Sequence, residues 1–186
     1  CPVTRVERSV DGVVIHSAAG SEHFDKVVFA CHSVEALNLL AAPSAAEQSI
    51  LGALPYANNE VVLHTDTRLL PSRKLAWASW NYRLGGSGHT RAAVTYNMNI
   101  LQGIQSDTTF CVSLNQSAGI TPSKVLHRFT YAHPQYSVTA VAAQQRWEEL
   151  NGALHTYYCG AYWANGFHED GVVSALRVAS SLGQTL

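Results

Sequence analysis

Alternating apolar and polar positions fill the first part of the chain. The pattern runs over Val3 to Ser9 and Val13 to Ser17, with Asp11-Gly12 between the two segments. Alternation gives a strand one face toward a core, and an Asp-Gly pair is typical of a tight hairpin turn. The next strand candidate, Phe24 to Ala30, contains an uninterrupted apolar run from Val27 onward, which is typical of a strand buried on both faces. We therefore predict a β-hairpin followed by a buried strand.

Two short helices are expected next. Ser33 precedes an apolar-periodic segment over Val34 to Leu40, and a Ser at that position can accept a hydrogen bond from the first helical turn. A proline then interrupts the chain, so a domain crossing is expected at residues 41–44. Ser44 and Glu47 have the spacing of a capping box, in which each side chain satisfies a backbone N–H group at the start of a helix.

The middle of the chain contains five segments rich in β-branched and aromatic residues, separated by turn-forming residues. Short strands joined by such turns favour a mostly antiparallel sheet. The expected strands are Glu60 to Asp66, Leu75 to Leu84, Ala92 to Met98, Thr109 to Leu114 and Val125 to Tyr131. A helix over Thr139 to Leu150 is expected to follow the sheet and to end at Asn151-Gly152.

The last part of the chain has the pattern of a strand, a glycine turn and a helix. Thr156 to Cys159 is β-favouring, and the small residues Gly160 and Ala161 that follow allow close approach to the backbone. From Gly171 apolar residues recur with the helical period, and Gly183 lies beyond the last turn as a stop signal. We expect a buried helix whose first turn also suits an anionic or electron-rich ligand.

Composition narrows the classes of function. Apolar residues make up 47% of the 186 residues and charged residues only 13%, against about a quarter in ordinary soluble domains. The formal net charge is −1, without the basic excess that attracts nucleic acid or an acidic membrane surface. We expect neither of these partners, and we expect the apolar surface to favour self-association into a homo-oligomer.

Cysteine spacing and hydropathy set further limits. Cys1, Cys31, Cys111 and Cys159 occur singly in apolar surroundings, which predicts buried free thiols and neither disulfides nor a zinc site. No metal site is expected. No apolar run approaches the ~20 residues of a membrane-spanning helix, and no signal peptide is visible, so the default localisation is cytoplasmic.

Two segments carry a resemblance to a known superfamily. Residues 160–162 and residues 166–175, GFHEDGVVSA, resemble the C-terminal flavin-contacting segment of the FAD-dependent amine oxidases and carotenoid desaturases. The resemblance is closest to the predicted NAD/FAD-binding proteins of that group. Residues 24–32, FDKVVFACH, resemble a strand of the same superfamily in which an Asp precedes an apolar run. Landmarks similar to those of its substrate domain are His64-Thr65-Asp66, Trp77 to Tyr82 and His133-Pro134.

The resemblance implies an α+β fold of defined organisation. A mostly antiparallel mixed sheet would form the substrate domain of an FAD-linked oxidoreductase, and pieces of an FAD-binding α/β domain would stand at both ends. Residues 1–42 are then expected in the FAD-binding domain and residues 43–138 in the substrate-binding domain. Residues 139–186 would return to the FAD-binding domain with the flavin-contacting turn and helix.

One element of the superfamily is missing from the sequence. Its members bind the ADP half of FAD with a G-x-G-x-x-G turn near the N-terminus, and this chain has no such turn. The nearest string, GGSGHT over Gly85 to Thr90, lacks the third glycine and reads as a hairpin loop. Together with a start at Cys1, this predicts an inactive C-terminal fragment of a longer enzyme, with weak or absent FAD binding.

The resemblance places the cofactor contacts near the end of the chain. The residues expected to line FAD are Gly160, Ala161, Gly166, Phe167, His168, Glu169 and Asp170. Backbone N–H groups at the helix start would stabilise negative charge on a flavin that accepts a hydride. The structural alternative is that Gly160 and Gly166 permit tight turns and Asp170 caps the helix. Many amine oxidases carry a Glu after the glycine that Gly160 matches, whereas Ala161 follows here, so a carboxylate contact to the cofactor is not carried over.

Aromatic side chains of the central segment are candidates for a substrate pocket: Trp77, Trp80, Tyr82 and Tyr96. Alternation along a strand would place Trp80 and Tyr82 on one face and Trp77 on the other, so Trp77 and Trp80 cannot both face the flavin without a bulge. Packing in a core is the alternative role for these side chains.

No catalytic residue is assigned from the sequence. His64, His127 and His133 are possible acid–base groups, because imidazole titrates near neutral pH; a hydrogen-bonded or surface role is the alternative. Amine oxidases of the superfamily often place a Lys beside the flavin, but neither Lys74 nor Lys124 lies in a motif that carries this role over.

The sequence therefore predicts part of an FAD-dependent oxidoreductase. The parent enzyme would transfer a hydride to flavin from a small-molecule substrate, either an amine or an apolar, lipid-like compound as in a desaturase. A non-catalytic ligand-binding or dimerisation module derived from such an enzyme is the alternative. A hydrolase is not indicated, because the chain has no Gly-x-Ser-x-Gly elbow.

Overall fold

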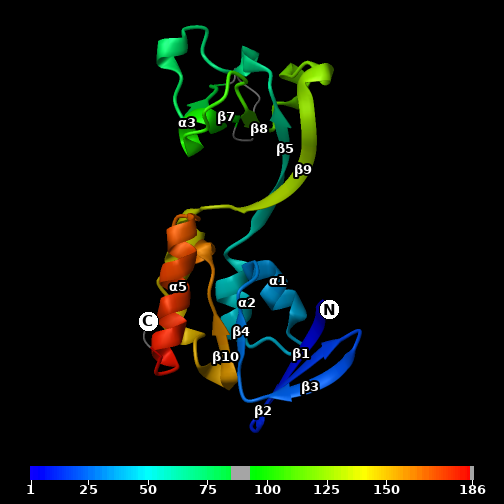
Figure 1. Cartoon of the computed structure of the whole chain (residues 1–186). Coiled ribbons are helices and arrows are strands. Elements are labelled where there is room, and N and C mark those ends of the chain that lie inside the picture. Colours follow the sequence, from blue (N-terminus) through cyan, green and yellow to red (C-terminus); the bar gives the residue numbers. More distant parts are fainter. Residues whose placement is uncertain (85–92, 185–186) are drawn as a thin grey trace. The chain divides into compact units, whose positions relative to one another are not determined.

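The computed structural model describes residues 1–84 and 93–184, and within them the chain forms two compact units. Unit 1 contains residues 1–56 and 134–186, and unit 2 contains residues 57–133. Both combine helices with largely antiparallel strands (Figure 1), so the α+β class is confirmed. The unit boundaries lie at 56/57 and 133/134, whereas the sequence placed the domain crossings at 42/43 and 138/139. The string Gly85 to Thr90 lies outside the described residues.

Unit 1 begins with the predicted hairpin. Strands β1 (Val3–Ser9) and β2 (Gly12–Ser17) pair antiparallel across Asp11, and β3 (Gly20–Phe24) extends the sheet on the other side of β2. Val6 and Val13 are the buried residues of this sheet that join the core. The alternating pattern and the Asp-Gly turn thus act as expected.

The second sheet of unit 1 joins distant parts of the chain. Strand β4 (Val27–Phe29) pairs in parallel with β10 (Thr156–Tyr158), and the rings of Phe29 and Tyr158 stack with centroids 5.4 Å apart. Burial on both faces of β4 was predicted, and this is wrong, because Val28 is 43% exposed. Val28 points to the opposite face from Val27 and Phe29, and on that face the packing is at Tyr157 and Cys159 and does not include Val28.

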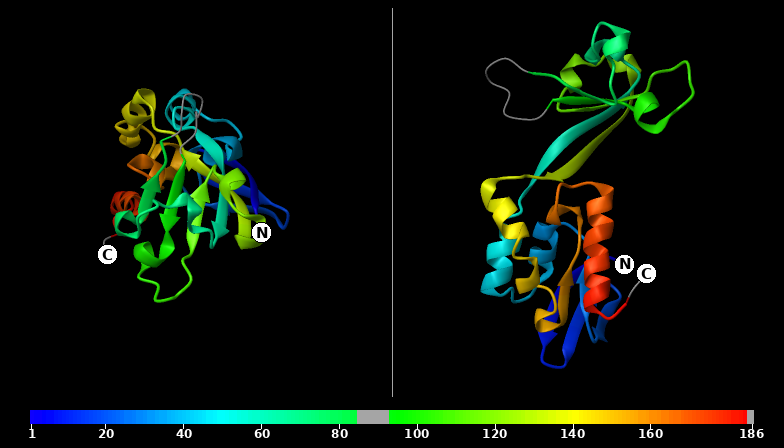
Figure 2. Two further views of the ribbon diagram at one scale, coloured as in Figure 1. Left: turned by 90° about the horizontal axis from the view of Figure 1, so that it is seen from above. Right: turned by 90° about the vertical axis from the view of Figure 1, so that its left-hand side faces the viewer.

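Helices cover both faces of the β4–β10 pair (Figure 2). One group packs into the main core of the unit, and α5 contacts the opposite face through Val178, which packs against Tyr157 and Cys159. The helices of the first group are α1 (Ser33–Leu39), α2 (Ala45–Gly52) and α4 (Val138–Gln144); α5 spans His168–Ser181. Short 3₁₀ turns η5 (Trp147–Glu149), η6 (Ala153–His155) and η7 (Ala161–Trp163) connect them.

The helix starts show one correct prediction and one error. The capping box is confirmed, because the Glu47 N–H donates to Ser44 Oγ at 3.2 Å and the Ser44 N–H donates to Glu47 Oε2 at 2.7 Å. Ser33 is not the cap of α1. It is the first helical residue, is fully buried, and donates its hydroxyl hydrogen bond to Leu54 O at 2.6 Å. The hydroxyl that was predicted to cap the helix therefore makes a tertiary contact.

Unit 2 is built on a five-stranded sheet in the order β6-β7-β8-β5-β9. Its strands are β5 (Tyr56–His64), β6 (Trp80–Tyr82), β7 (Val94–Asn97), β8 (Cys111–Leu114) and β9 (Val125–Pro134). The pairings of β6 with β7, β7 with β8 and β8 with β5 are antiparallel, as predicted. The short elements between them are η1 (Thr67–Leu69), η2 (Lys74–Ala76), α3 (Met98–Gln102), η3 (Ser117–Gly119) and η4 (Pro122–Lys124).

The long strand predicted over Leu75 to Leu84 is mostly absent. The Trp77 N–H closes a turn onto Lys74 O at 3.0 Å, and the Trp77 indole N–H donates to Pro71 O at 2.7 Å. These local bonds take the donors that a strand would give to a neighbour, so only β6 remains of it.

Candidate functional site

In unit 1, the end of β10 is tied to the first turns of α5. The Gly160 N–H donates to Ser174 Oγ at 2.8 Å, and that hydroxyl donates to Gly171 O at 2.9 Å. Ser174 is 2% exposed, so this pair of bonds is shielded from water. The predicted order of strand, glycine turn and helix is confirmed, and the turn and the helix start lie side by side (Figure 1).

Gly160 is required by close packing. A Cβ atom at this position would lie 2.5 Å from Cε1 of Tyr162, and the Tyr162 ring is held in the core at 2% exposure. Any side chain at residue 160 would therefore collide with this buried ring.

Gly166 and Asp170 have visible structural roles. Gly166 has a φ of +88°, and a Cβ there would lie 2.6 Å from the Tyr136 hydroxyl oxygen. Asp170 Oδ2 accepts the N–H groups of Asn165 at 3.1 Å and of Phe167 at 2.9 Å. These contacts are the tight turn and the cap of the structural alternative. The cofactor role of the two residues remains a prediction.

The N-terminus of α5 is accessible. The helix begins at His168 and has Glu169 and Asp170 in its first turn, as expected. Phe167 is 52% exposed, and His168 and Glu169 are also exposed. The first turn thus presents backbone N–H groups and the positive end of the helix dipole at the surface.

The prediction that α5 is a buried helix is wrong. Val172 is 52% exposed, and Val173 and Leu176 are each 39% exposed, whereas only Ser174 and Val178 are buried. The helix packs on β10 through one narrow face, and the apolar residues at 172, 173 and 176 lie on its outer side. We call these three residues the outer apolar face of α5.

In unit 2, the strand register separates a polar face of the sheet from an aromatic face. Asn81 pairs with Thr95 and Thr95 with Ser113, while Trp80 pairs with Tyr96. Because side chains alternate along a strand, the first three lie on one face, the polar face. The other face carries Trp80 and Tyr96, whose rings meet edge to face with centroids 5.7 Å apart.

Strand β9 adds to the aromatic face. His127, Phe129 and Tyr131 stack along the strand, with centroids 4.4 Å and 5.3 Å apart. Arg128 lies on the opposite side, because it pairs with Glu60 at 2.9 Å, which is on the polar face. Sequence reasoning missed this row, although aromatic rings at every second position from 127 to 131 were the signal for it.

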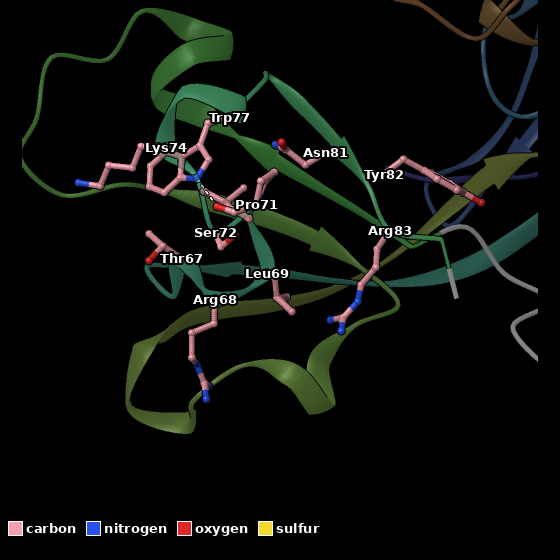
Figure 3. Close-up of a pocket in the computed structure, with 11 residues that line it drawn as sticks. Thr67, Arg68, Leu69, Pro71, Ser72, Lys74, Trp77, Asn81, Tyr82 and Arg83 are labelled. Carbon is pink, nitrogen blue, oxygen red and sulfur yellow. Dashed lines mark hydrogen bonds between the residues drawn. The ribbon is translucent and has the colours of Figure 1, made fainter. Parts of the chain in front are cut away.

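Of the predicted pocket residues, three lie on the aromatic face. Trp80 and Tyr82 share it by alternation, at 52% and 62% exposure, and Tyr96 lies beside Trp80. Trp77 does not join them: it follows η2, and the Lys74 ammonium lies 5.8 Å from the centre of its ring (Figure 3). The role of all four in binding a substrate is untested.

His64 has a structural role in the polar face. Its Nδ1 accepts the Asp66 N–H at 3.1 Å, so Nε2 carries the proton and donates to Ser113 Oγ at 2.8 Å. The side chain is fully buried, and burial lowers the pKa of His64. A neutral, enclosed imidazole with both nitrogens bonded is not placed for proton exchange with a substrate.

Asp66 anchors the segment that covers the polar face. It is fully buried, and it accepts hydrogen bonds from Arg68 (Nη2 to Oδ2, 2.7 Å) and from the N–H and hydroxyl of Thr121 (2.8 Å and 2.7 Å). The Arg68 bonds, with those of Thr121, hold the pKa of this carboxyl far below its usual range although burial opposes them. Asp66 is therefore a fixed anion of the fold.

His133 is oriented by a chain of amides. The Glu60 N–H donates to Asn115 Oδ1 at 3.2 Å, Asn115 Nδ2 donates to Asn59 Oδ1 at 2.7 Å, and Asn59 Nδ2 contacts His133 Nδ1 at 3.0 Å. Because a backbone N–H can only donate, every later amide has one possible orientation. His133 Nδ1 is then the acceptor, and its Nε2 carries the proton.

Reactive thiols, metal ligands and membrane-spanning helices are further features that could carry function in the described residues. The cysteines are free: Cys111 and Cys159 are buried as predicted, Cys31 is half-buried, and Cys1 is exposed, against the prediction. Burial raises the pKa of the Cys111 thiol to about 11. Within residues 1–84 and 93–184, no group of three His, Cys, Asp or Glu could hold a metal ion, and no helix has the length and apolar character to cross a membrane.

Comparison with known proteins places this geometry in a class of enzyme folds. No family model and no curated protein matches the chain. Among solved structures, it is similar to the CLA-producing fatty acid isomerase from P. acnes, with a TM-score of 0.66 and 14% identity. It is also similar to a putrescine oxidase bound to putrescine (0.61, 9%) and to the cyclohexylamine oxidase from Brevibacterium oxydans IH-35A (0.51, 13%).

The structural alignments cover nearly all of this chain but less than half of each of these enzymes. The alignments cover 96%, 97% and 98% of this chain, and 46%, 48% and 49% of the isomerase, the putrescine oxidase and the cyclohexylamine oxidase. The chain therefore has the fold of about half of such an enzyme. This supports the predicted resemblance at the level of the fold.

Proposed function

We propose that the chain is the substrate-domain-bearing part of an FAD-dependent oxidoreductase of the amine oxidase type. The carrying observation is the joined strand, turn and helix start at residues 156–171, in a chain with half the fold of such oxidases. FAD bound by the whole enzyme would supply the hydride acceptor. The chain's own contribution would be to position that acceptor and the substrate.

The residues at the start of α5 fit a flavin edge. Ala161 has a small side chain, Phe167 offers an exposed ring, and residues 168 and 169 in the first turn of α5 are exposed. Exposed N–H groups at a helix start are fixed dipoles, which stabilise added negative charge with little reorganisation. Gly160, Gly166 and Asp170 would keep this backbone in place.

The aromatic face of unit 2 supports an apolar or amine substrate. Trp80, Tyr96 and Phe129 present aromatic surface with few charges, which suits a hydrocarbon or the cation of an amine. The amide chain orients His133, which is on the same strand as Phe129. No proton transfer is assigned to it.

Titration of FAD tests the proposal. The flavin absorbance and fluorescence are recorded with this chain and with a longer protein extended toward the parent N-terminus. We expect binding by the longer protein and weak or no binding by the chain alone. If neither binds, the flavoenzyme proposal fails, and a non-catalytic binding module becomes the better description.

A charge variant makes the test specific for the α5 N-terminus. His168→Asp in the longer protein adds an acidic group that favours the helix start but repels an electron-rich flavin edge, so we expect FAD affinity to fall by about fivefold. His23→Asp, on the exposed strand β3, is the matched control and should leave the affinity unchanged. Equal FAD affinity of the two variants would contradict flavin binding at the N-terminus of α5.

A further inference from the structure

A cationic hollow lies beside the sheet of unit 2. It has a volume of about 680 Å³ and is formed by residues 67–72, Lys74, Trp77 and residues 81–83 (Figure 3). This volume is in the range of small-molecule sites, which is roughly 300–1,000 Å³. Asn81 of the polar face lines the hollow, and so does Tyr82 of the aromatic face. The hollow shares no residue with those proposed to contact FAD.

The lining of the hollow is cationic. Lys74 and Arg83 contribute cations to it, and a third basic residue, Arg68, is paired with the buried Asp66. Among the described residues that line the hollow, none is acidic. The nearest carboxylate in sequence, Asp66, is fully buried and bound to Arg68 and Thr121, so it presents no charge to a ligand. Figure 3 shows the Arg68 and Arg83 side chains extending in the same direction. The hollow is therefore positively charged, although the whole chain has a net charge of −1.

The hollow also has an apolar wall with a fixed ring. Leu69, Leu70, Pro71 and Trp77 line it. The indole N–H of Trp77 donates to Pro71 O at 2.7 Å, which holds the ring in place, and the Lys74 ammonium lies 5.8 Å from the ring centre. Cations beside a rigid apolar surface suit a ligand with one anionic end and one apolar end.

We propose that this hollow binds the carboxylate or phosphate group of an amphiphilic molecule. Arg83 at one end of the hollow or Lys74 at the other contacts the oxyanion, and Trp77 packs on the apolar part. The same head group could be offered by a dissolved molecule or by a lipid in a bilayer. Leu75 and Leu84 flank the hollow in sequence and are 103% and 86% exposed, as residues that insert into a bilayer surface would be.

The first arm of the test uses dissolved probes. Decanoate and decyl phosphate are titrated into the full chain, and the indole N–H signal of Trp77, assigned with Trp77→Phe, is followed by NMR. We expect a saturable shift of this signal and none for Trp163 in unit 1. The double variant Arg83→Gln/Lys74→Gln should weaken binding by about tenfold, because charge-assisted contacts are lost. Arg177→Gln, an exposed arginine on α5, is the control.

The second arm uses vesicles of phosphatidylcholine with and without phosphatidylglycerol. Co-sedimentation only with the anionic vesicles, lost in the double variant, would identify a bilayer lipid as the source of the head group. Binding of the dissolved probes without vesicle binding would identify a free amphiphile. Failure of every probe to bind, or binding that the double variant leaves unchanged, would overturn the proposal. Both replaced side chains are exposed, and circular dichroism would verify that the variant is folded.

Discussion

A buried ion pair joins three distant parts of unit 1 at the residue scale. The side chains of Arg8 and Glu47 are each 4% exposed, Arg8 Nη2 donates to Glu47 Oε2 at 2.9 Å, and the Tyr158 hydroxyl donates to Glu47 Oε1 at 2.6 Å. Burial opposes ionisation, yet the bonds from Arg8 and Tyr158 lower the pKa of Glu47 overall. Glu47 therefore stabilises both α2 and the contact between β1 and β10.

Replacing Glu47 should destabilise unit 1 strongly. Glu47→Gln leaves the Arg8 cation buried without its counter-ion, and breaking a buried pair in this way costs about 3 kcal/mol or more. Urea unfolding followed by circular dichroism measures the loss. Glu149→Gln removes an exposed pair with Arg146 and should have a much smaller effect, since such pairs are screened by water. Equal effects of the two variants would contradict the role given to Glu47.

Asp66 should make unit 2 sensitive to acid. Its pKa in the folded chain lies below the ordinary value of 3.8, so the unfolded chain takes up this proton first as the pH falls. The stabilisation is complete above about pH 4 and is lost as the pH decreases through the folded pKa. We expect Asp66→Asn to be less stable than the wild type at neutral pH and to show a weaker dependence on acid. An unchanged acid profile in the variant would show that Asp66 is not the responsible group.

At the scale of the elements, the glycine turn between β10 and α5 should not tolerate a side chain at residue 160. Gly160→Ala would place a methyl group 2.5 Å from the buried Tyr162 ring, so we expect a loss of about 1–3 kcal/mol in unfolding free energy. Gly52→Ala, at the end of α2 and 4.0 Å from the nearest side chain, has no collision and is the control. Thermal unfolding compares them. A Gly160→Ala variant as stable as the control would mean that the ring can move.

Elements were predictable where local chemistry decides the structure. The Asp-Gly turn of the first hairpin and the Ser44–Glu47 capping box both form as their sequences indicate. Prediction failed where a distant partner decides. Ser33 bonds to Leu54 O and does not cap α1, and the indole of Trp77 finds Pro71 O, which favours a turn over a strand.

The candidate sites show the same division. Gly160 and the start of α5 could be located from their sequence pattern, and the face shared by Trp80 and Tyr82 follows from strand alternation. The position of Trp77 in the hollow, away from Trp80, could not be predicted from the sequence. It depends on tertiary hydrogen bonds within residues 67–77, such as the one from the Trp77 indole to Pro71 O. Exposure of the outer apolar face of α5 was missed as well, since a helical period alone does not tell which neighbour covers a helix.

For the whole molecule, the outer apolar face of α5 should cause self-association. Val172, Val173 and Leu176 expose apolar surface on one helix side, and contiguous patches of this kind mark interaction sites. We expect sedimentation to show concentration-dependent association that Leu176→Lys reduces. Val10→Lys, at an 89% exposed residue of the first hairpin, should leave it unchanged. A monomer at all micromolar concentrations would contradict this prediction.

The parallel pairing of β4 with β10 has a consequence for the order of events during synthesis. The two strands are separated by the whole of unit 2, so unit 1 cannot complete its second sheet until residues 156–158 have left the ribosome. Residues 57–133 are continuous in sequence and can fold first. Until then, Val27, Phe29 and the helices α1 and α2 lack their partner strand, so their apolar core residues remain exposed on the nascent chain. A chaperone acting on this protein is expected to bind there.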